Sequence, residues 1–251
     1  MNLTEDERFF IKRMTELRDR SASRGIYTNS LFLTPAEQAL VSNYIGGKTL
    51  SFEGGFADAE RKIAVFGTEE DCGYSFAPPL VYLFLHPTAP KFAEDLSHRD
   101  ILGAAMNCGL RRDRLGDIIV TEAGAYLICL DTAADYLTEN LTKIRHTPVA
   151  AQRVDSLPET AVKLPEISET VAASERLDAL IAAVWNLSRS EAKETVVREL
   201  AAVNGAPVTD PSVTVPTGAT VSLRGRGRFR YEGILRETKS GKCRVAVRVY
   251  G

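Results

Sequence analysis

Apolar and polar positions along the first 79 residues repeat mainly with a helical period. Thr4 and Glu7 have the spacing of a capping box, in front of an apolar helical face. Thr34 and Glu37 repeat that spacing, with a proline directly after the threonine. We therefore expect residues 1–79 to form a mainly helical N-terminal domain.

Residues 80–155 change from this pattern to one that mixes strands and helices. The expected elements are a strand at 80–86, a helix from Ser97 to Asn107, a hairpin at 117–130, a helix at 132–144 and a strand at 147–154. This βαββαβ order is typical of ferredoxin-like domains, and many RNA-recognition modules share it. We therefore expect a ferredoxin-like (RRM-like) middle domain.

The remainder of the chain divides into a linker and a third domain. Residues 156–170 contain two prolines and little periodicity, which predicts a linker with room for one strand. Residues 171–251 predict two short helices, with the second starting at Ser188, then strands joined by a turn at Ser240-Gly241. The fold class is therefore α+β, with three small domains.

Charge is distributed unevenly along the chain. The 251 residues are 44% hydrophobic and 25% charged, with a net charge of -2. The segment from Gly218 to Gly251 contains nine basic and two acidic residues. Its net charge is therefore +7, and the rest of the chain carries -9. A basic end on an acidic body indicates a localised site for an anionic partner such as nucleic acid.

The candidate RNA-binding residues of the third domain fall into two groups. The first group lies at the starts of the two predicted helices and comprises Arg176, Ser188, Arg189, Ser190 and Lys193. The second group is Arg224, Arg226, Arg228 and Arg230, which would share one face of a single strand. Guanidinium, ammonium and hydroxyl groups are the chemistry that binds an RNA backbone. The alternative for the arginine row is a solvated edge strand protected by its charge.

The sequence gives little indication of metal binding, a membrane segment or catalysis. The four cysteines have no C-x-x-C spacing and the three histidines are not spaced as metal ligands, so we expect no metal and no cofactor. No apolar run reaches about 18 residues, so we expect a cytoplasmic protein without a membrane segment.

Arg176-Leu177-Asp178 matches the catalytic motif of pseudouridine synthases, but the continuation ALIAAV differs, and Asp178 is better explained as an acid near a helix N-terminus.

Several motifs resemble a known family. RLDALIA, SRSEA, VNG and RGRGRF, in that order, resemble the S4 RNA-binding domain. FEGGFADAERK and LSHRDILGAAMNCGLRRDRLGDIIV resemble the YlmH family, bacterial S4-domain proteins related to a photosystem-associated group. The resemblance implies binding to the large ribosomal subunit, its ribosomal RNA and peptidyl-tRNA, in ribosome-associated quality control.

The resemblance also implies further contact residues. It adds Asn204 to the RNA-binding residues of the third domain. A second RNA-facing patch would comprise Arg61, His98, Arg99, Arg111, Arg112 and Arg114. The usual glycine at the end of the second helix is replaced by Glu199, which we expect to lengthen that helix.

These observations lead to one functional expectation and two alternatives. We expect a monomeric, non-enzymatic protein that binds ribosomal RNA and tRNA. The first alternative is an RNA-modifying enzyme that uses the S4 domain as an anchor. The second is an interaction scaffold in cell division or organelle assembly.

Overall fold

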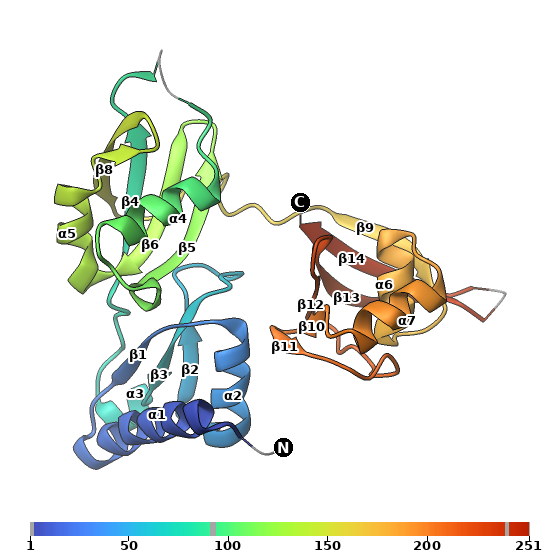
Figure 1. Cartoon of the computed structure of the whole chain (residues 1–251). Helices are drawn as coiled ribbons and strands as arrows, with labels where there is room; N and C mark the ends of the chain where they lie inside the picture. Colours follow the sequence, from blue (N-terminus) through green and yellow to red (C-terminus); the bar gives the residue numbers. More distant parts are fainter. Residues whose placement is uncertain (1–2, 91–93, 239–240, 251) are drawn as a thin grey trace. The chain divides into compact units, whose positions relative to one another are not determined.

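The structure, a computed structural model shown in Figure 1, describes residues 3–90, 94–238 and 241–250. The chain folds into two compact units, Met1–Lys163 and Leu164–Gly251, whose boundary falls within the predicted linker. Both units combine α-helices with antiparallel sheets, which confirms the predicted α+β class. Among the described residues, no helix has both the length and the apolar character needed to cross a lipid bilayer.

The prediction of a mainly helical N-terminal domain misses a three-stranded sheet with the order β1-β3-β2. The elements are α1 (Glu5–Arg24), β1 (Thr28–Leu33), α2 (Pro35–Ile45), β2 (Leu50–Glu53), β3 (Lys62–Phe66) and α3 (Glu69–Cys72). The central strand β3 is almost entirely buried. A short apolar run of this kind does not distinguish a buried strand from a helix by periodicity alone.

Local capping chemistry explains where the first two long helices begin. Thr4 and Glu7 form a complete capping box at α1, and Thr34 and Glu37 form another at α2. In each box the threonine hydroxyl accepts from the glutamate N–H, and the glutamate carboxylate accepts from the threonine N–H. Both predicted helix starts are confirmed.

The second half of the first unit has the predicted βαββαβ order. Its elements are β4 (Leu80–Pro87), α4 (His98–Asn107), the 3-10 turn η2 (Arg112–Arg114), β5 (Leu115–Thr121), β6 (Gly124–Leu130), α5 (Asp131–Asn140), β7 (Lys143–Ile144) and β8 (Thr147–Val154). The strands form one sheet with the order β5-β6-β4-β8-β7. The predicted helix at 132–144 is too long, because Ile144 lies in β7 and pairs with Thr147 of β8. Ile144 is buried, and its apolar character fits a helical spacing and a strand pairing equally well.

The two faces of this sheet have different neighbours. Helices α4 and α5 cover one face, where Leu83 and Leu127 pack with Ile101 and Leu137 (Figure 1). On the other face, Ile128 packs with residues of the N-terminal sheet. The two sheets of the first unit therefore share an apolar contact.

The second unit is a six-stranded sheet covered on one face by two helices (Figure 1). Its elements are β9 (Ile167–Ala172), α6 (Leu177–Trp185), α7 (Arg189–Val197), β10 (Ala201–Val203), β11 (Ala206–Pro207), β12 (Thr220–Leu223), β13 (Gly227–Glu237) and β14 (Cys243–Tyr250). Leu180 and Val196 pack against Phe229 and Val247 in its core. The strand order is β11-β10-β12-β13-β14-β9.

The strand that the predicted linker allowed is present in this unit, whereas the predicted lengthening of the second helix is wrong. Residues 167–170 of the predicted linker belong to β9, which pairs with β14. Glu199 does not lengthen the second helix, because α7 ends at Val197 and Glu199 has a φ of +57°. A left-handed residue ends an α-helix whether or not it is glycine. The predicted turn at Ser240-Gly241 falls partly outside the described residues, at Ser240.

Candidate RNA-binding surfaces

The two helices of the second unit are joined at their starts by one buried carboxylate, Asp178. Asp178 lies in the first turn of α6 and is 3% exposed. Its Oδ1 accepts a hydrogen bond from Arg176 Nε at 3.2 Å, and its Oδ2 accepts one from an Arg189 guanidinium N–H at 2.9 Å. Asp178 therefore holds both arginine side chains, and its predicted place as a helix N-terminal acid is confirmed.

The pKa of Asp178 reflects this arrangement. Burial alone raises its pKa, because it disfavours the charged carboxylate. The hydrogen bonds and positive charges of Arg176 and Arg189 outweigh burial, so the net pKa is lowered. The carboxylate stays ionised, and the side chains of Arg176 and Arg189 remain 44% and 45% exposed. Positive charge is thus held in place and still accessible to an anion.

The start of α7 adds further polar groups. Ser188 caps the helix through a capping box with Glu191, so its hydroxyl accepts from a backbone N–H. Ser190 and Lys193 are exposed. Arg189 and Lys193 are four residues apart and therefore lie on the same side of α7.

The predicted row of four arginines on one strand is wrong. Arg224 and Arg226 lie in a turn between β12 and β13, whereas Arg228 and Arg230 lie in β13. The turn forms because Gly225 and Gly227 adopt φ values of +81° and +97°, which glycine tolerates best. The two pairs of arginines therefore have different surroundings.

Arg226 lies near the start of α7. Hydrogen bonds from Ser188 lower the pKa of Glu191, and the charge of Arg226 lowers it further. We call the set Arg176, Ser188, Arg189, Ser190, Lys193 and Arg226 the helix-start surface. It gathers four cations and two hydroxyls from three separate segments of the chain.

Arg228 and Arg230 lie on the opposite face of the sheet from the two helices. Between them, Phe229 is buried in the core under the helices, so its neighbours in the strand point away. The Arg228 guanidinium lies 4.7 Å from the centre of the Tyr250 ring, and Arg230 Nε lies 3.7 Å from Glu232 Oε1. Both charges are therefore engaged within the unit.

Asn204 supports a tight turn. It has a φ of +49°, and its Oδ1 accepts from the Thr220 N–H at 2.9 Å. Its side chain thus connects the turn between β10 and β11 to the start of β12. Its predicted RNA contact remains a prediction.

The residues of the predicted second patch do not form one exposed group. Arg61 donates to the carbonyls of Phe32 and Leu115 at 3.1 Å, and Arg112 donates to Leu115 O at 2.6 Å. Burial and the nearby charge of Arg61 lower the pKa of Arg112 to about 10. Arg61 therefore connects the N-terminal sheet to β5, and Arg112 holds η2 against the start of β5, so both arginines have structural roles.

The other members of that patch lie around α4 and η2. His98 and Arg99 are exposed at the start of α4, Arg111 pairs with Asp113, and Arg114 donates to Thr132 Oγ1 at 3.1 Å. Sequence reasoning missed two further cations near Arg99. Arg99, Lys143 and Arg145 line one hollow of about 510 Å³, formed where α4 meets the β7–β8 turn. No local sequence signal joins these elements.

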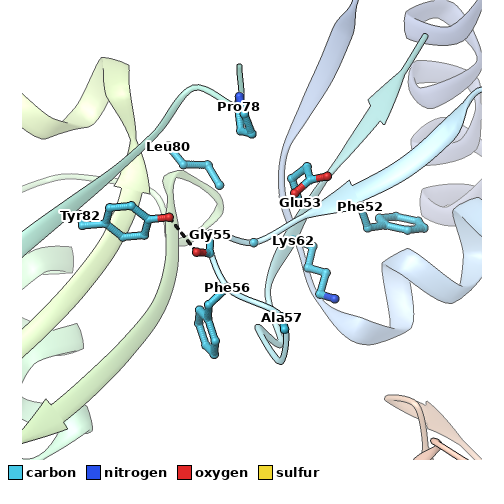
Figure 2. A pocket seen from close by; sticks show the side chains of 10 residues that line it. Phe52, Glu53, Gly55, Phe56, Ala57, Lys62, Pro78, Leu80 and Tyr82 are labelled. Carbon is cyan, nitrogen blue, oxygen red and sulfur yellow. Dashed lines mark hydrogen bonds between the residues drawn. The ribbon is translucent and has the colours of Figure 1, made fainter. Parts of the chain in front are cut away.

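A second hollow of about 410 Å³ lies between β2 and β4 (Figure 2). Figure 2 shows Tyr82 reaching the loop after β2, where its hydroxyl donates to Gly55 O at 2.7 Å. Glu53 and Lys62 are the charged residues that line it. Because these charges have opposite signs, the hollow offers no net attraction to an anionic ligand such as RNA.

Comparisons with known proteins find similarity to a family that is described as RNA-binding. Residues 82–157 match a family model described as "Putative RNA-binding domain in YlmH". The chain is 33% identical to "Ribosome-associated protein quality control protein P2" of Bacillus subtilis (strain 168), over 96% of this chain and 94% of that protein. A solved structure, "Cell division protein ylmH from Streptococcus pneumoniae", is 21% identical with a TM-score of 0.48, covering 64% of this chain and 96% of that chain.

Proposed function

This chain belongs to the YlmH family, and from that premise we propose that it binds RNA on the large ribosomal subunit in ribosome-associated quality control. The proposed RNA partners are ribosomal RNA and peptidyl-tRNA. The name of the Bacillus subtilis relative supports the ribosomal setting, because that protein is similar over nearly the whole of both chains.

The observation that carries this proposal is the buried carboxylate Asp178 at the centre of the helix-start surface. By holding Arg176 and Arg189, it fixes two guanidinium groups before any ligand arrives. Preorganised side chains lose less conformational freedom on binding, so more of the interaction energy appears as affinity. RNA helices are recognised mainly through shape, phosphates and 2′-hydroxyls, which suits a surface of cations and hydroxyls.

We propose binding without catalysis at this surface. Asp178 occupies the position of the attacking aspartate in the pseudouridine synthase motif. Its carboxylate is buried and hydrogen-bonded to two arginines, an environment that stabilises a resting ion pair rather than an exposed nucleophile. The geometry therefore favours Asp178 as a positioning residue for RNA-binding arginines.

The direct test is sedimentation binding of the full chain to purified large ribosomal subunits. We expect Arg189→Glu with Lys193→Glu to weaken binding by at least 100-fold, because two phosphate contacts become repulsive. Lys12→Glu with Arg20→Glu is the matched control, since it makes the same charge change at exposed positions of α1. Equal binding by the Arg189 and Lys193 variant and the wild-type chain would refute the proposed docking surface.

A further inference from the structure

Three aromatic side chains lie next to one another on the sheet of the first unit. Phe84 and His86 come from β4, and Tyr126 comes from β6. The Phe84 and Tyr126 ring centres are 4.9 Å apart with an interplanar angle of 34°, and those of Phe84 and His86 are 5.6 Å apart at 26°. We call these three residues the aromatic row.

The row lies on the face of the sheet that α4 and α5 do not cover. Leu83 and Leu85 flank Phe84 and are buried in the core beneath the helices, so Phe84 points the other way. All three rings are partly exposed. The contact with the N-terminal sheet on this face is made through Ile128 and Leu130, beyond Tyr126 along β6. The aromatic row thus continues the sheet surface past that contact.

The strand pairing extends the row across four strands. Phe84 pairs with Tyr126 on one side and with Gln152 on the other, and Tyr126 pairs with Ile119. Directly paired residues of antiparallel strands share a face, so these four side chains form one continuous strip. The strip is uncharged, and it combines ring faces with an exposed amide that can both donate and accept hydrogen bonds.

This chemistry suits unpaired nucleobases. Every base has an apolar face that stacks on an aromatic ring and polar edges that an amide can hydrogen-bond. Sheets that bind single-stranded RNA use aromatic side chains on adjacent strands for two or three bases. Phe84 and His86 also line a hollow of about 730 Å³ at the end of the sheet, so the rings border open space.

We propose that the aromatic row is a stacking site for two or three unpaired bases of single-stranded RNA. This inference rests on the proposed RNA-binding function and assigns it a second, separate site. The match of residues 82–157 to an RNA-binding family model supports it, because that range contains all three rings. The rings of Phe84 and Tyr126 carry the stacking, and Gln152 reads a base edge.

The charge around the row predicts a salt dependence that distinguishes RNA from the main competing ligand, a basic peptide. Glu94, Asp95 and Glu122 line the hollow beside the rings. Arg145 lies 3.4 Å from Glu94 and offsets part of this acidity. Phosphates therefore gain little attraction here, so base stacking must supply the affinity and binding should depend only weakly on salt. Binding of a Lys- or Arg-rich peptide would instead rely on attraction to these carboxylates, so its affinity would depend strongly on salt.

The test uses the full chain and a labelled ten-nucleotide single-stranded RNA, with its duplex as comparison. We expect Phe84→Leu with Tyr126→Leu to weaken single-strand binding by about 100-fold, or about ten-fold per ring, and duplex binding by less than about two-fold. Phe84→Tyr with Tyr126→Phe keeps both rings and should keep the affinity. Tyr136→Leu is the matched control, because it removes an exposed ring from α5 on the helix side of the sheet.

A second measurement covers the case in which the leucine variant fails to fold. The wild-type chain has one tryptophan, Trp185, so in Phe84→Trp single-stranded RNA should quench more of the tryptophan fluorescence than it does in the wild-type chain. Full single-strand affinity in a folded leucine variant, or no added quenching in Phe84→Trp, would overturn the stacking site. Ring-dependent binding of an oligoarginine peptide without ring-dependent binding of RNA would overturn it too. Such a failure leaves the proposed function intact if Arg189→Glu with Lys193→Glu still weakens binding to ribosomal subunits.

Discussion

The helix-start surface and the aromatic row present opposite chemistry on two sheets of the same chain. The first consists of cations and hydroxyls at the ends of two helices, fixed by Asp178. The second is an uncharged strip of rings on a sheet face. Charged groups suit the phosphates of folded RNA, and rings suit bases that are not paired. The two proposed sites would therefore bind two states of RNA through two different forces, electrostatic attraction and stacking.

The largest difference between the two regions should appear in salt dependence. The helix-start surface offers four cations, so binding of structured RNA should weaken by about 100-fold between 50 and 200 mM KCl. Binding of the ten-nucleotide single strand to the Arg189→Glu with Lys193→Glu variant should change by less than about five-fold over that range. Fluorescence anisotropy titrations measure both. Equal salt slopes for the two ligands would remove the distinction.

Asp178 should matter for stability as well as for RNA binding. Asp178→Asn removes the charge that two arginines share, and we expect a loss of about 2 kcal/mol in the free energy of unfolding. Urea denaturation measures this loss. Asp19→Asn breaks an exposed ion pair with Arg18 and serves as the control, with an expected loss below about 1 kcal/mol. Similar losses in both variants would show that burial of Asp178 adds nothing.

The stability that Asp178 contributes should depend on pH. Its folded pKa is lowered below the ordinary value of 3.8, so the unfolded chain binds a proton more readily as the solution is acidified. Its contribution to stability is therefore present above about pH 4 and is lost as the pH falls through the folded pKa. Urea midpoints between pH 5 and pH 3 should fall less steeply for Asp178→Asn than for the wild-type chain. Parallel curves would contradict this assignment.

Local signals predicted much of the fold. The helix starts predicted at Thr4, Thr34, Ser97 and Ser188 are confirmed, and each has a capping box formed by residues three positions apart. The βαββαβ order followed from the period of apolar residues. Gly225 and Gly227 show the limit of such signals. The spacing of the four arginines predicts one strand through both glycines, but their left-handed conformations make a turn that gives the two pairs of arginines different surroundings.

The site residues were harder to predict where they depend on pairing between distant segments. Phe84 and Tyr126 become neighbours only through the register of β4 and β6. Lys143 and Arg145 join Arg99 only because α4 packs near β7. Asp178 was identified as a helix-start acid, but its bond to Arg189 requires the packing of α6 against α7. A linear sequence carries no direct record of such contacts.

The smallest effect is expected on the sheet face opposite the helix-start surface. Arg228 lies over the Tyr250 ring and Arg230 pairs with Glu232, so both charges already have partners. Arg228→Ala with Arg230→Ala should change affinity for structured RNA by less than about two-fold and cost about 1 kcal/mol of stability. A loss as large as that of Arg189→Glu with Lys193→Glu would place RNA on this face instead.

An electron-microscopy map of the chain bound to large ribosomal subunits would test the central claim most directly. The account predicts RNA density against the start of α7, within contact distance of Arg189 and Lys193. Density against Arg228 and Arg230, with α6 and α7 facing solvent, would contradict it.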